Sequence, residues 1–442
     1  MSRKIQMVVA GISMVALVFA TNAFSAKLKV EEYNKANINW QQFAGQRLLI
    51  AMNKHGYTDG IEKIISEFEK LTQIKVTLDV YSEEEFRKKR LVALAAGGGI
   101  FDVMMMDQAL VQYVEAGWLE PWDSHIDNPK LVDSNWYDFK DIFLSGIGHG
   151  TYKGKLYGMP ITTEAEILYY RKDIFAEKGL AVPTTMDELY ETAVKLKTKE
   201  MSGIAMRGHR GWGANVWSWT GFPFTYGGKV FDEKGMPIFN SPEVVAATEM
   251  YAKLLQDAGP KGAVNYNWYE VLTDFQQGKT AMVIDSSGFM TPFEDPTQSM
   301  VAGKIGYTMM PRVPGKPLKA NYWHWMLSLA SDSAHKGEAT LFLAWATSPA
   351  GSMYTGLETG YSVRESVWKA EEFQSKYPSD FLTATLQTIL EADPIVQIWH
   401  IKEFPEIGEG LSIAICDVIV GTKSAKQALD EAVKKAMEIL QR

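Results

Sequence analysis

This sequence has very little cysteine and lacks the histidine spacings that bind metal ions. Its 442 residues contain one cysteine, Cys416, and seven histidines. A single cysteine excludes an intramolecular disulfide, and within the apolar run LSIAICDVIV it is typical of inert packing. The histidines form no HExxH motif and no pair spaced by four residues, the spacings that bind zinc from one helix. We therefore expect no disulfide, no metal and no cofactor.

Basic clusters and phosphate-binding loops are missing as well. The net charge is −8, and no block of lysine or arginine indicates nucleic acid as a partner. QGKTAM (277–282) contains Gly-Lys-Thr, but Thr273 stands where a phosphate loop needs a glycine. The triple glycine at 97–99 precedes a strand, and no G-x-S-x-G motif supplies an esterase nucleophile. These absences exclude nucleotide binding and esterase chemistry.

The segment 1–25 has the three-part pattern of a secretory signal. Two basic residues precede an apolar run at 7–20, and small residues allow cleavage before Ala26 or before Phe24. The run is shorter than the roughly 20 residues needed to span a bilayer. No cysteine follows it for lipid attachment, so we expect a soluble protein outside the cytoplasm.

Strand and helix patterns alternate along the first part of the chain. RLLIAM (47–52) and IKVTLDV (74–80) are predicted strands, and between them Asp59 and Glu62 resemble a capping box that begins a helix. This order predicts parallel pairing with a right-handed crossover. Further elements are predicted at about 83–96, 101–106, from 107, after 183, and at 241–258, 335–347 and the C-terminus. We expect two α/β lobes that share the chain through several crossings.

The stretch RGHRGWGANVWSWTGF (207–222) gathers aromatic side chains among glycines. Trp212, Trp217 and Trp219 fit neither a helical nor a strand period well. We therefore expect a loop that presents rings.

Glu164 and Glu166 offer a pair of carboxylates in ITTEAEI. On a strand, residues i and i+2 face the same side about 6–7 Å apart, a separation that glycosidases use. The same spacing is common on solvated strand faces, so both interpretations stay open.

A set of segments in a fixed order covers nearly the whole chain after residue 25. It includes FEKLTQIKV (68–76), LAAGGGIFDVMMMD (94–107), YVEAGWLEPW (113–122), YKGKLYGMPITTEAEILYYRKDIFAEKGL (152–180), FQQGKTAMVIDSSGF (275–289) and FLAWATSP (342–349). The set resembles the extracellular solute-binding proteins of bacterial sugar ABC transporters, the group that includes maltodextrin and polyol binders. One departure is Gln73, where the family usually has glycine after threonine.

The resemblance implies a two-lobe periplasmic-binding-protein fold. Each lobe is an open α/β sheet, crossover hinge strands near 162–166 and 325–329 join the lobes, and a sugar is captured in the cleft by hinge closure. We expect lobe I to comprise 26–163 with 329–376, and lobe II to comprise 164–328 with 377–442. The resemblance also implies a periplasmic monomer, without enzymatic activity, that delivers a sugar, sugar alcohol or short glycoside to an inner-membrane ABC permease.

The resemblance places the ligand-binding residues at strand ends and loops around the cleft. They are Asn53, His55, Asp107, Glu164, Trp212, Trp217, Trp219, Asp285, Phe289, Trp323 and Arg364. Such residues suit a sugar, because aromatic rings stack on its C–H faces while charged and amide groups pair with its hydroxyls.

Structural roles are the alternatives for these candidates. For the tryptophans the alternative is packing, for Asn53 and His55 it is helix capping, and for the carboxylates it is solvation or ion pairing. Trp118, Trp122 and Trp345 are predicted to pack within the lobes.

The triplet Arg207, His209 and Arg210 separates two kinds of ligand. If it points outward as a surface patch the ligand is neutral, and if it points inward the ligand is anionic. A cationic solute in an aromatic cage is a further alternative. The alternative from another class is a secreted glycosidase that uses Glu164.

Overall fold

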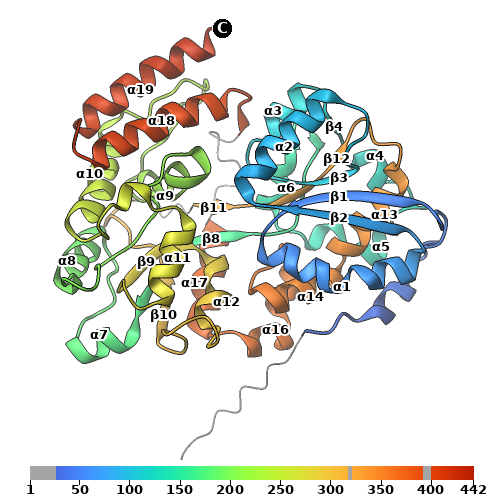
Figure 1. Cartoon of the computed structure of the whole chain (residues 1–442), viewed down its shortest axis with the longest axis horizontal. Helices are drawn as coiled ribbons and strands as arrows, with labels where there is room; N and C mark the ends of the chain where they lie inside the picture. Colours follow the sequence, from blue (N-terminus) through green and yellow to red (C-terminus); the bar gives the residue numbers. More distant parts are fainter. Residues whose placement is uncertain (1–25, 317–320, 392–399) are drawn as a thin grey trace, which may run out of the picture.

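Two β-sheets, each with its own helices, divide the chain into two lobes (Figure 1). The structure is a computed structural model that describes residues 26–316, 321–391 and 400–442. The predicted secretory signal at 1–25 lies outside the described residues. We call the lobe with the six-stranded sheet the first lobe and the lobe with the four-stranded sheet the second lobe. The predicted two-lobe α/β architecture is confirmed.

The sheet of the first lobe combines strands that lie far apart in the sequence. Its order is β2, β1, β3, β12, β4, and β7 also pairs with β12. These strands are β1 (Arg47–Asn53), β2 (Lys75–Tyr81), β3 (Val103–Met106), β4 (Leu119–Glu120), β7 (Met159–Pro160) and β12 (Met326–Ala330). Every residue of β3 is buried, which explains its continuous apolar sequence. A hairpin of β5 (Thr151–Tyr152) and β6 (Lys155–Leu156) lies apart from this sheet.

The helices of the first lobe come from two parts of the chain, one before residue 164 and one after residue 325. They are η1 (Val30–Lys35), α1 (Gly56–Thr72), α2 (Glu83–Ala96), α3 (Leu110–Glu115), α4 (Asp123–Ile126), α5 (Ser134–Tyr137), η2 (Phe139–Asp141), α6 (Leu144–Gly150), α13 (Lys336–Thr347), α14 (Pro349–Thr359), α15 (Glu365–Lys369) and α16 (Glu371–Lys376). α14 packs against α1, so the later helices cover the helix that the first strand leads into.

The unit β1, α1, β2 has the predicted parallel pairing, with Arg47 opposite Lys75. The predicted helix start at Asp59 is wrong, because α1 begins at Gly56. His55 caps it: its ring Nδ1 accepts the backbone N–H of Tyr57 at 3.1 Å. A histidine ring thus does what an aspartate side chain was expected to do.

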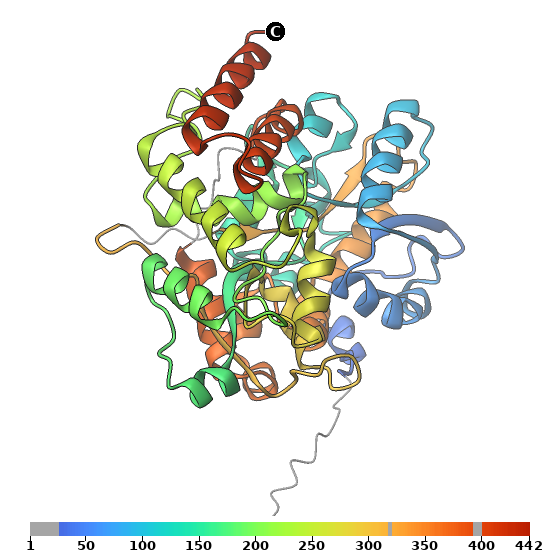
Figure 2. The same ribbon diagram turned by 60° about the vertical axis from the view of Figure 1, so that its left-hand side comes forward.

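The second lobe is built around β8 (Glu164–Arg171), whose first six residues are buried. β9 (Met282–Ser286), β10 (Ile305–Met309) and β11 (Tyr322–Trp323) all pair with it in antiparallel fashion. The helices are α7 (Lys172–Lys178), α8 (Met186–Leu196), η3 (Trp212–Val216), α9 (Trp217–Thr225), α10 (Pro242–Asp257), η4 (Ala263–Asn265), α11 (Trp268–Gln276), η5 (Ser287–Phe289), α12 (Met290–Glu294), α17 (Ser379–Glu391), α18 (Phe404–Ile419) and α19 (Ala425–Leu440). α18 and α19, red in Figure 2, pack against each other and against α10.

Three crossings connect the lobes: one joins α16 to α17 through 377–378, and the other two are neighbours. Of these neighbours, one runs from β7 to β8 through 161–163, and the other runs from β11 to β12 through 324–325. They are hydrogen-bonded to each other: Ile161 N–H donates to the Trp325 carbonyl at 2.8 Å, and Trp325 N–H donates to Thr162 Oγ1 at 3.0 Å. Because these two crossings are short and bonded as a pair, the lobes meet at a narrow hinge region.

The tryptophan stretch is helical, so the expectation of a loop is wrong. Residues 212–216 form a π-helical turn that leads into α9. Two of its glycines allow other side chains to approach the helix backbone closely. A Cβ at Gly213 would lie 2.8 Å from the Arg87 guanidinium, and one at Gly221 would lie 2.0 Å from the Glu166 carboxyl. Tertiary packing therefore overrides the low helical propensity of glycine here.

Gln73 occupies the left-handed region with φ 60°, at the C-cap of α1. This conformation strains the folded state of a non-glycine residue by about 1–2 kcal/mol. Replacing that residue by glycine removes the strain, but it also stabilises the unfolded chain by about 0.4–1 kcal/mol because glycine is more flexible. We expect Gln73→Gly to raise the free energy of unfolding by about 0.5–1 kcal/mol in urea denaturation. The control variant Gln427→Gly, at an exposed helical position, should lower the free energy of unfolding by about 1 kcal/mol. A lower free energy of unfolding in both variants would refute the strain at residue 73.

Candidate ligand-binding site

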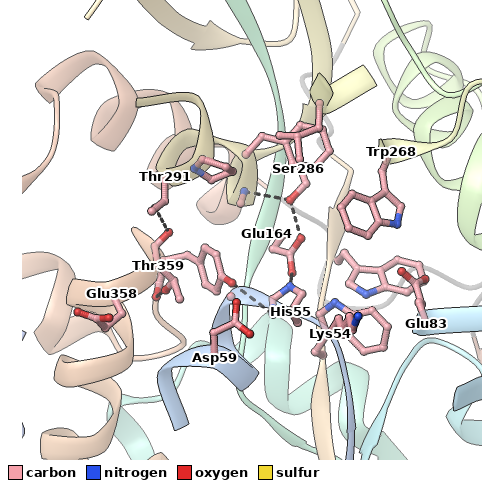
Figure 3. A pocket seen from close by; sticks show the side chains of 18 of the residues that line it. Lys54, His55, Asp59, Glu83, Glu164, Trp268, Ser286, Thr291, Glu358 and Thr359 are labelled. Atoms are coloured by element: carbon pink, nitrogen blue, oxygen red, sulfur yellow. Dashed lines mark hydrogen bonds and ion pairs between the residues drawn. The ribbon is translucent and has the colours of Figure 1, made fainter. Parts of the chain in front are cut away.

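A cavity of about 450 Å³ opens between the lobes beside the two neighbouring crossings. Side chains from both lobes line it (Figure 3): His55 and Asp59 from the start of α1, Glu164 and Ser286 from strand ends, and Trp268 from α11. Strand ends of α/β sheets are a common place for small-molecule binding. The sequence positions therefore converge on a single inter-lobe site.

The Glu164 carboxylate joins the two lobes across this cavity. His55 Nε2 lies 3.0 Å from Oε1, and Ser286 Oγ donates to Oε2 at 2.5 Å (Figure 3). Since His55 Nδ1 accepts the Tyr57 N–H, Nε2 carries the proton that is donated to Glu164. Burial raises the pKa of Glu164, but the hydrogen bonds from His55 and Ser286 and the nearby Arg207 charge outweigh it and lower the pKa overall. Glu164 is therefore a charged acceptor at the hinge.

Arg207 is the second buried charge that faces the cavity, and Asp285 neutralises it. The guanidinium donates to both carboxylate oxygens at 2.9 and 2.5 Å. Burial alone would lower the pKa of Arg207, yet the Asp285 charge and hydrogen bonds raise it. The guanidinium also lies over the Trp217 ring, 4.4 Å from its centroid. Arg207 thus positions Trp217 and carries no unmatched charge into the cavity.

The basic triplet therefore divides. Arg207 points inward, whereas Arg210 is exposed and pairs with Glu409 at 2.5 Å. His209 is half-buried, and its backbone N–H donates to the Tyr266 carbonyl. The three residues form no common patch, and an inward arginine already held by a carboxylate gives no reason for an anionic ligand.

Aromatic rings form much of the remaining wall. Trp323 meets Trp217 edge to face at 6.3 Å and Trp325 at 5.7 Å between ring centroids. Tyr361 continues this wall next to His55, with its hydroxyl 3.4 Å from Nδ1. On the other side Trp268 lies 6.4 Å from Phe289. The cavity thus offers several ring surfaces around the Glu164 and Arg207 groups.

The structure places part of the expected ligand-binding set at this cavity. The expected residues that line it are His55, Glu164, Trp217, Phe289 and Trp323. Asp285 does not line the cavity, but it supports Arg207 directly behind the wall. Asn53 ends β1 outside the lining, 1% exposed, and its amide donates to the Lys54 carbonyl at 3.3 Å.

Asp107 was expected at the cavity but does not line it, because arginines of its own lobe hold it. Its fully buried carboxylate accepts from Arg87 at 2.9 Å and from Arg90 at 3.0 Å. Burial raises the pKa of Asp107, but the Arg90 and Arg87 charges lower it to about 2. Both carboxylate oxygens are therefore already paired with arginines of the first lobe.

Three further candidates also lie outside the cavity lining. Trp219 is completely buried, and its Nε1 donates to Thr248 Oγ1 at 2.9 Å. Arg364 is completely buried, and its guanidinium donates to backbone carbonyls of the first lobe at 2.8 Å. Trp212 stacks 6.3 Å from Trp323, behind the cavity wall. Packing within the lobes is the physical reason that these three side chains lie outside the lining.

Several lining residues were missed in the sequence. Among them are Trp268, Ser286, Trp325 and Tyr361. Two of them could have been chosen from the sequence. Trp325 follows Trp323 by two residues, so both lie on one face of an extended segment. Tyr361 lies in the same segment as the candidate Arg364. Trp268 opens α11 inside a capping box, a position that gave no sign of a ligand.

The expected packing roles of three tryptophans and of Cys416 are confirmed. Trp122 and Trp345 are buried in the first lobe, and Trp118 packs against its core. The Cys416 thiol lies on α18 next to Asn215, and burial raises its pKa to about 11, so it is protonated. Among the residues that the structure describes, no group of three His, Cys, Asp or Glu side chains is placed to hold a metal. None of the described helices is long and apolar enough to cross a membrane.

Glu166 does not join Glu164 at the cavity, so the expected carboxylate pair is not available there. α9 covers its side chain, and Asn321 Nδ2 donates to Oε2 at 3.1 Å. Burial, together with the nearby Asp285 charge, raises the pKa of Glu166 well above its usual value, although the Asn321 hydrogen bond and Arg207 oppose this. Glu166 is therefore not available as the second carboxylate of a glycosidase beside Glu164.

The profile of a family described as bacterial extracellular solute-binding protein matches residues 55–353. A mannitol-binding protein of Pseudomonas aeruginosa is 29% identical over 384 residues, which cover 82% of this chain and 86% of that protein. An erythritol/L-threitol-binding protein of Mycolicibacterium smegmatis is 26% identical over 409 residues, which cover 88% of this chain and 85% of that protein.

A solved structure shows the same architecture. The crystal structure of an ABC transporter solute-binding protein from Agrobacterium radiobacter, in complex with ribitol, has a TM-score of 0.81 and 27% sequence identity. The alignment covers 90% of this chain and 99% of that chain. The match therefore includes both lobes and the crossings between them.

We expect Glu166→Gln to increase the free energy of unfolding at neutral pH. The folded-state pKa of Glu166 lies above its unfolded value of 4.5, so its contribution is fully present below that pH and is lost as the pH rises. Glutamine keeps the shape without this loss. Urea denaturation should therefore show a gain near pH 7 that vanishes near about pH 4.

The matched variant Glu164→Gln should behave oppositely, because the folded-state pKa of Glu164 is lowered. Its stabilising contribution is present above the unfolded pKa and is lost as the pH falls through the folded pKa. Glu164→Gln should therefore be less stable than the wild type near neutral pH, with a gap that narrows on acidification. The same pH dependence in both variants would contradict the assigned environments.

Proposed function

The chain belongs to the bacterial extracellular solute-binding proteins, and from this premise we propose that it captures a neutral sugar alcohol or small sugar for an ABC importer. The observation that carries the proposal is the pairing of the buried charges at the cavity. Arg207 is held by Asp285, and Glu164 already accepts hydrogen bonds from His55 and Ser286. In such a site the oriented polar groups can hydrogen-bond to hydroxyls of a solute, and the aromatic ring faces can pack on its C–H groups.

The chemistry of the relatives agrees with this reading. Two related proteins bear the names of sugar alcohols, and a third was solved with ribitol. A cavity of about 450 Å³ falls within the usual range of about 300–1,000 Å³ for a small-molecule site. An anionic solute would meet the Glu164 carboxylate and find Arg207 already occupied.

A cationic solute is the second candidate. The Glu164 carboxylate among Trp217, Trp323 and Trp325 resembles the environment that binds quaternary amines by cation–π contact. Against it, both Glu164 oxygens already accept hydrogen bonds, so the carboxylate is less exposed to a cation.

The proposal extends to location and delivery. The protein is secreted through the signal at 1–25, works in the periplasm as a monomer, and presents its closed form to an inner-membrane permease. The proposed lobes that close on the solute are 26–163 with 329–376 and 164–328 with 377–442, except that residues 326–328 belong to β12 of the first lobe. A permease that prefers the closed form makes delivery depend on ligand.

A thermal-shift screen tests the ligand class. We expect D-mannitol, ribitol or erythritol to raise the melting temperature of the mature protein, and glycerol 3-phosphate and glycine betaine to leave it unchanged. At a ligand concentration 100 times Kd the native state gains about 2.7 kcal/mol. A response limited to the phosphate or to betaine would overturn the neutral class, and cleavage of the recovered solute would overturn the binding-protein role.

Trp268 provides the sharper test of the site, because its ring lines the cavity while only half-buried. We expect Trp268→Ala to weaken mannitol binding by about 1–3 kcal/mol, or roughly 5- to 150-fold in Kd, with little loss of stability. Trp217→Ala should lose both affinity and stability, because that ring is 1% exposed and packed under Arg207. Titration calorimetry with urea denaturation separates the two effects.

Trp118→Ala is the matched control. This ring is also half-buried but lies in the first lobe outside the cavity lining. Its loss should leave mannitol affinity unchanged. Unchanged affinity in Trp268→Ala as well would remove Trp268 from the site.

A further inference from the structure

Arg87 on α2 reaches from the first lobe to the second. Its guanidinium carbon lies 4.5 Å from the centroid of the Trp212 ring, which belongs to η3. It also approaches the next residue, Gly213, where a Cβ would lie only 2.8 Å from Nη2. The missing side chain at 213 therefore leaves room for the guanidinium against the second lobe.

Two carboxylates of the first lobe hold Arg87 in this direction. Nε donates to Asp107 at 2.9 Å, and Nη2 lies 2.7 Å from Glu83. Asp107 is fully buried at the end of β3 and is also bound by Arg90, so its position is fixed. A planar guanidinium held along one edge presents its face, which suits stacking on an aromatic ring. The ion-pair cluster that includes Asp107 thus orients the Arg87 guanidinium toward the second lobe.

Trp212 is supported from the second lobe with similar firmness. It stacks on Trp323 of β11 with an interplanar angle of 22°, and it meets Phe404 of α18 edge to face at 5.4 Å. Trp323, Glu83 and Gly213 all line the cavity. The contact between Arg87 and Trp212 therefore lies at the edge of the cavity and adjoins the strand that leads into the hinge.

We propose that Arg87 and Trp212 form an inter-lobe latch that stabilises the closed lobes and slows release of the solute. Opening the lobes separates the guanidinium from the ring, but it leaves the pairs with Asp107 and Glu83 intact inside the first lobe. The cation–π contact therefore contributes to the closed form alone, and a contact made in one state shifts the population toward that state. The effect on release rests on the proposed function, whereas the effect on lobe separation does not.

Release kinetics test the latch with D-mannitol as the probe. Trp212→Leu removes the ring, and Arg87→Lys keeps the charge beside Asp107 but loses the planar face. We expect each variant to speed mannitol dissociation about 2- to 30-fold in stopped-flow fluorescence, the range that a cation–π contact gives, with little change in association. The double variant should dissociate no faster than the faster single variant, because both changes remove one contact.

Arg90→Lys is the matched control. Arg90 also donates to Asp107, but its guanidinium lies over Phe86 and Tyr113 of its own lobe. This variant should leave the dissociation rate unchanged even where it lowers stability. Equal acceleration in Arg90→Lys and Arg87→Lys would overturn the latch, because it would trace the effect to Asp107 alone.

A ligand-independent measurement separates the latch from the proposed function. Spin labels at the exposed positions Val92 on α2 and Val194 on α8, in a Cys416→Ser background, report the distance between the lobes. Without ligand, Trp212→Leu and Arg87→Lys should populate longer distances than the parent protein.

The two measurements give distinct failures. Longer distances in the variants with no mannitol response in the parent would reject the mannitol ligand and retain the latch. Unchanged distances and unchanged dissociation, in folded variants of a parent that binds mannitol, would reject the latch alone.

Discussion

The structure of the site depends on one buried charge, the Glu164 carboxylate at the first residue of β8. A carboxylate removed from water is costly unless hydrogen-bond donors surround it. The donors come from both lobes: His55 precedes α1 in the first lobe, and Ser286 ends β9 in the second. The position of Glu164 directly after a crossing lets one side chain tie the hinge to both walls of the cavity.

The same requirement explains the other buried ions. Arg207 is matched by Asp285, and Arg87 and Arg90 are matched by Asp107. Because these groups satisfy one another, the buried ions at and behind the cavity wall leave no large unmatched charge. Selectivity in such a wall arises from hydrogen bonds, since each buried polar group left unpaired costs about 1–3 kcal/mol. This arrangement favours a solute that brings many hydroxyls over one that brings a charge.

The hinge gives the arrangement its capacity to respond to ligand. The crossings at 161–163 and 324–325 are short and bonded to each other, whereas each lobe has its own sheet and core helices. Rotation about such a pair requires little change inside either lobe. In the proposed mechanism, contacts between lobes, including those of His55 with Glu164 and of Arg87 with Trp212, decide how long the closed form persists.

The sequence by itself determined the class of fold, the order of most strands and helices, and the family. These follow from local periodicity and from ordered segments spread along the chain, so they need no knowledge of distant contacts. It also located His55, Glu164, Trp217, Phe289 and Trp323, because residues at strand ends and in aromatic segments lie near the lobe boundary.

Only the tertiary structure decided which of several similar residues face the cavity. Trp217 and Trp219 are two positions apart, yet the helix turns one toward the cavity and the other into the core. Asp107 follows a buried strand as a binding carboxylate would, but Arg87 and Arg90, some 20 residues earlier in the chain, pair with it. The physical reason is that a side chain's role depends on its nearest partner, and packing between distant segments chooses that partner.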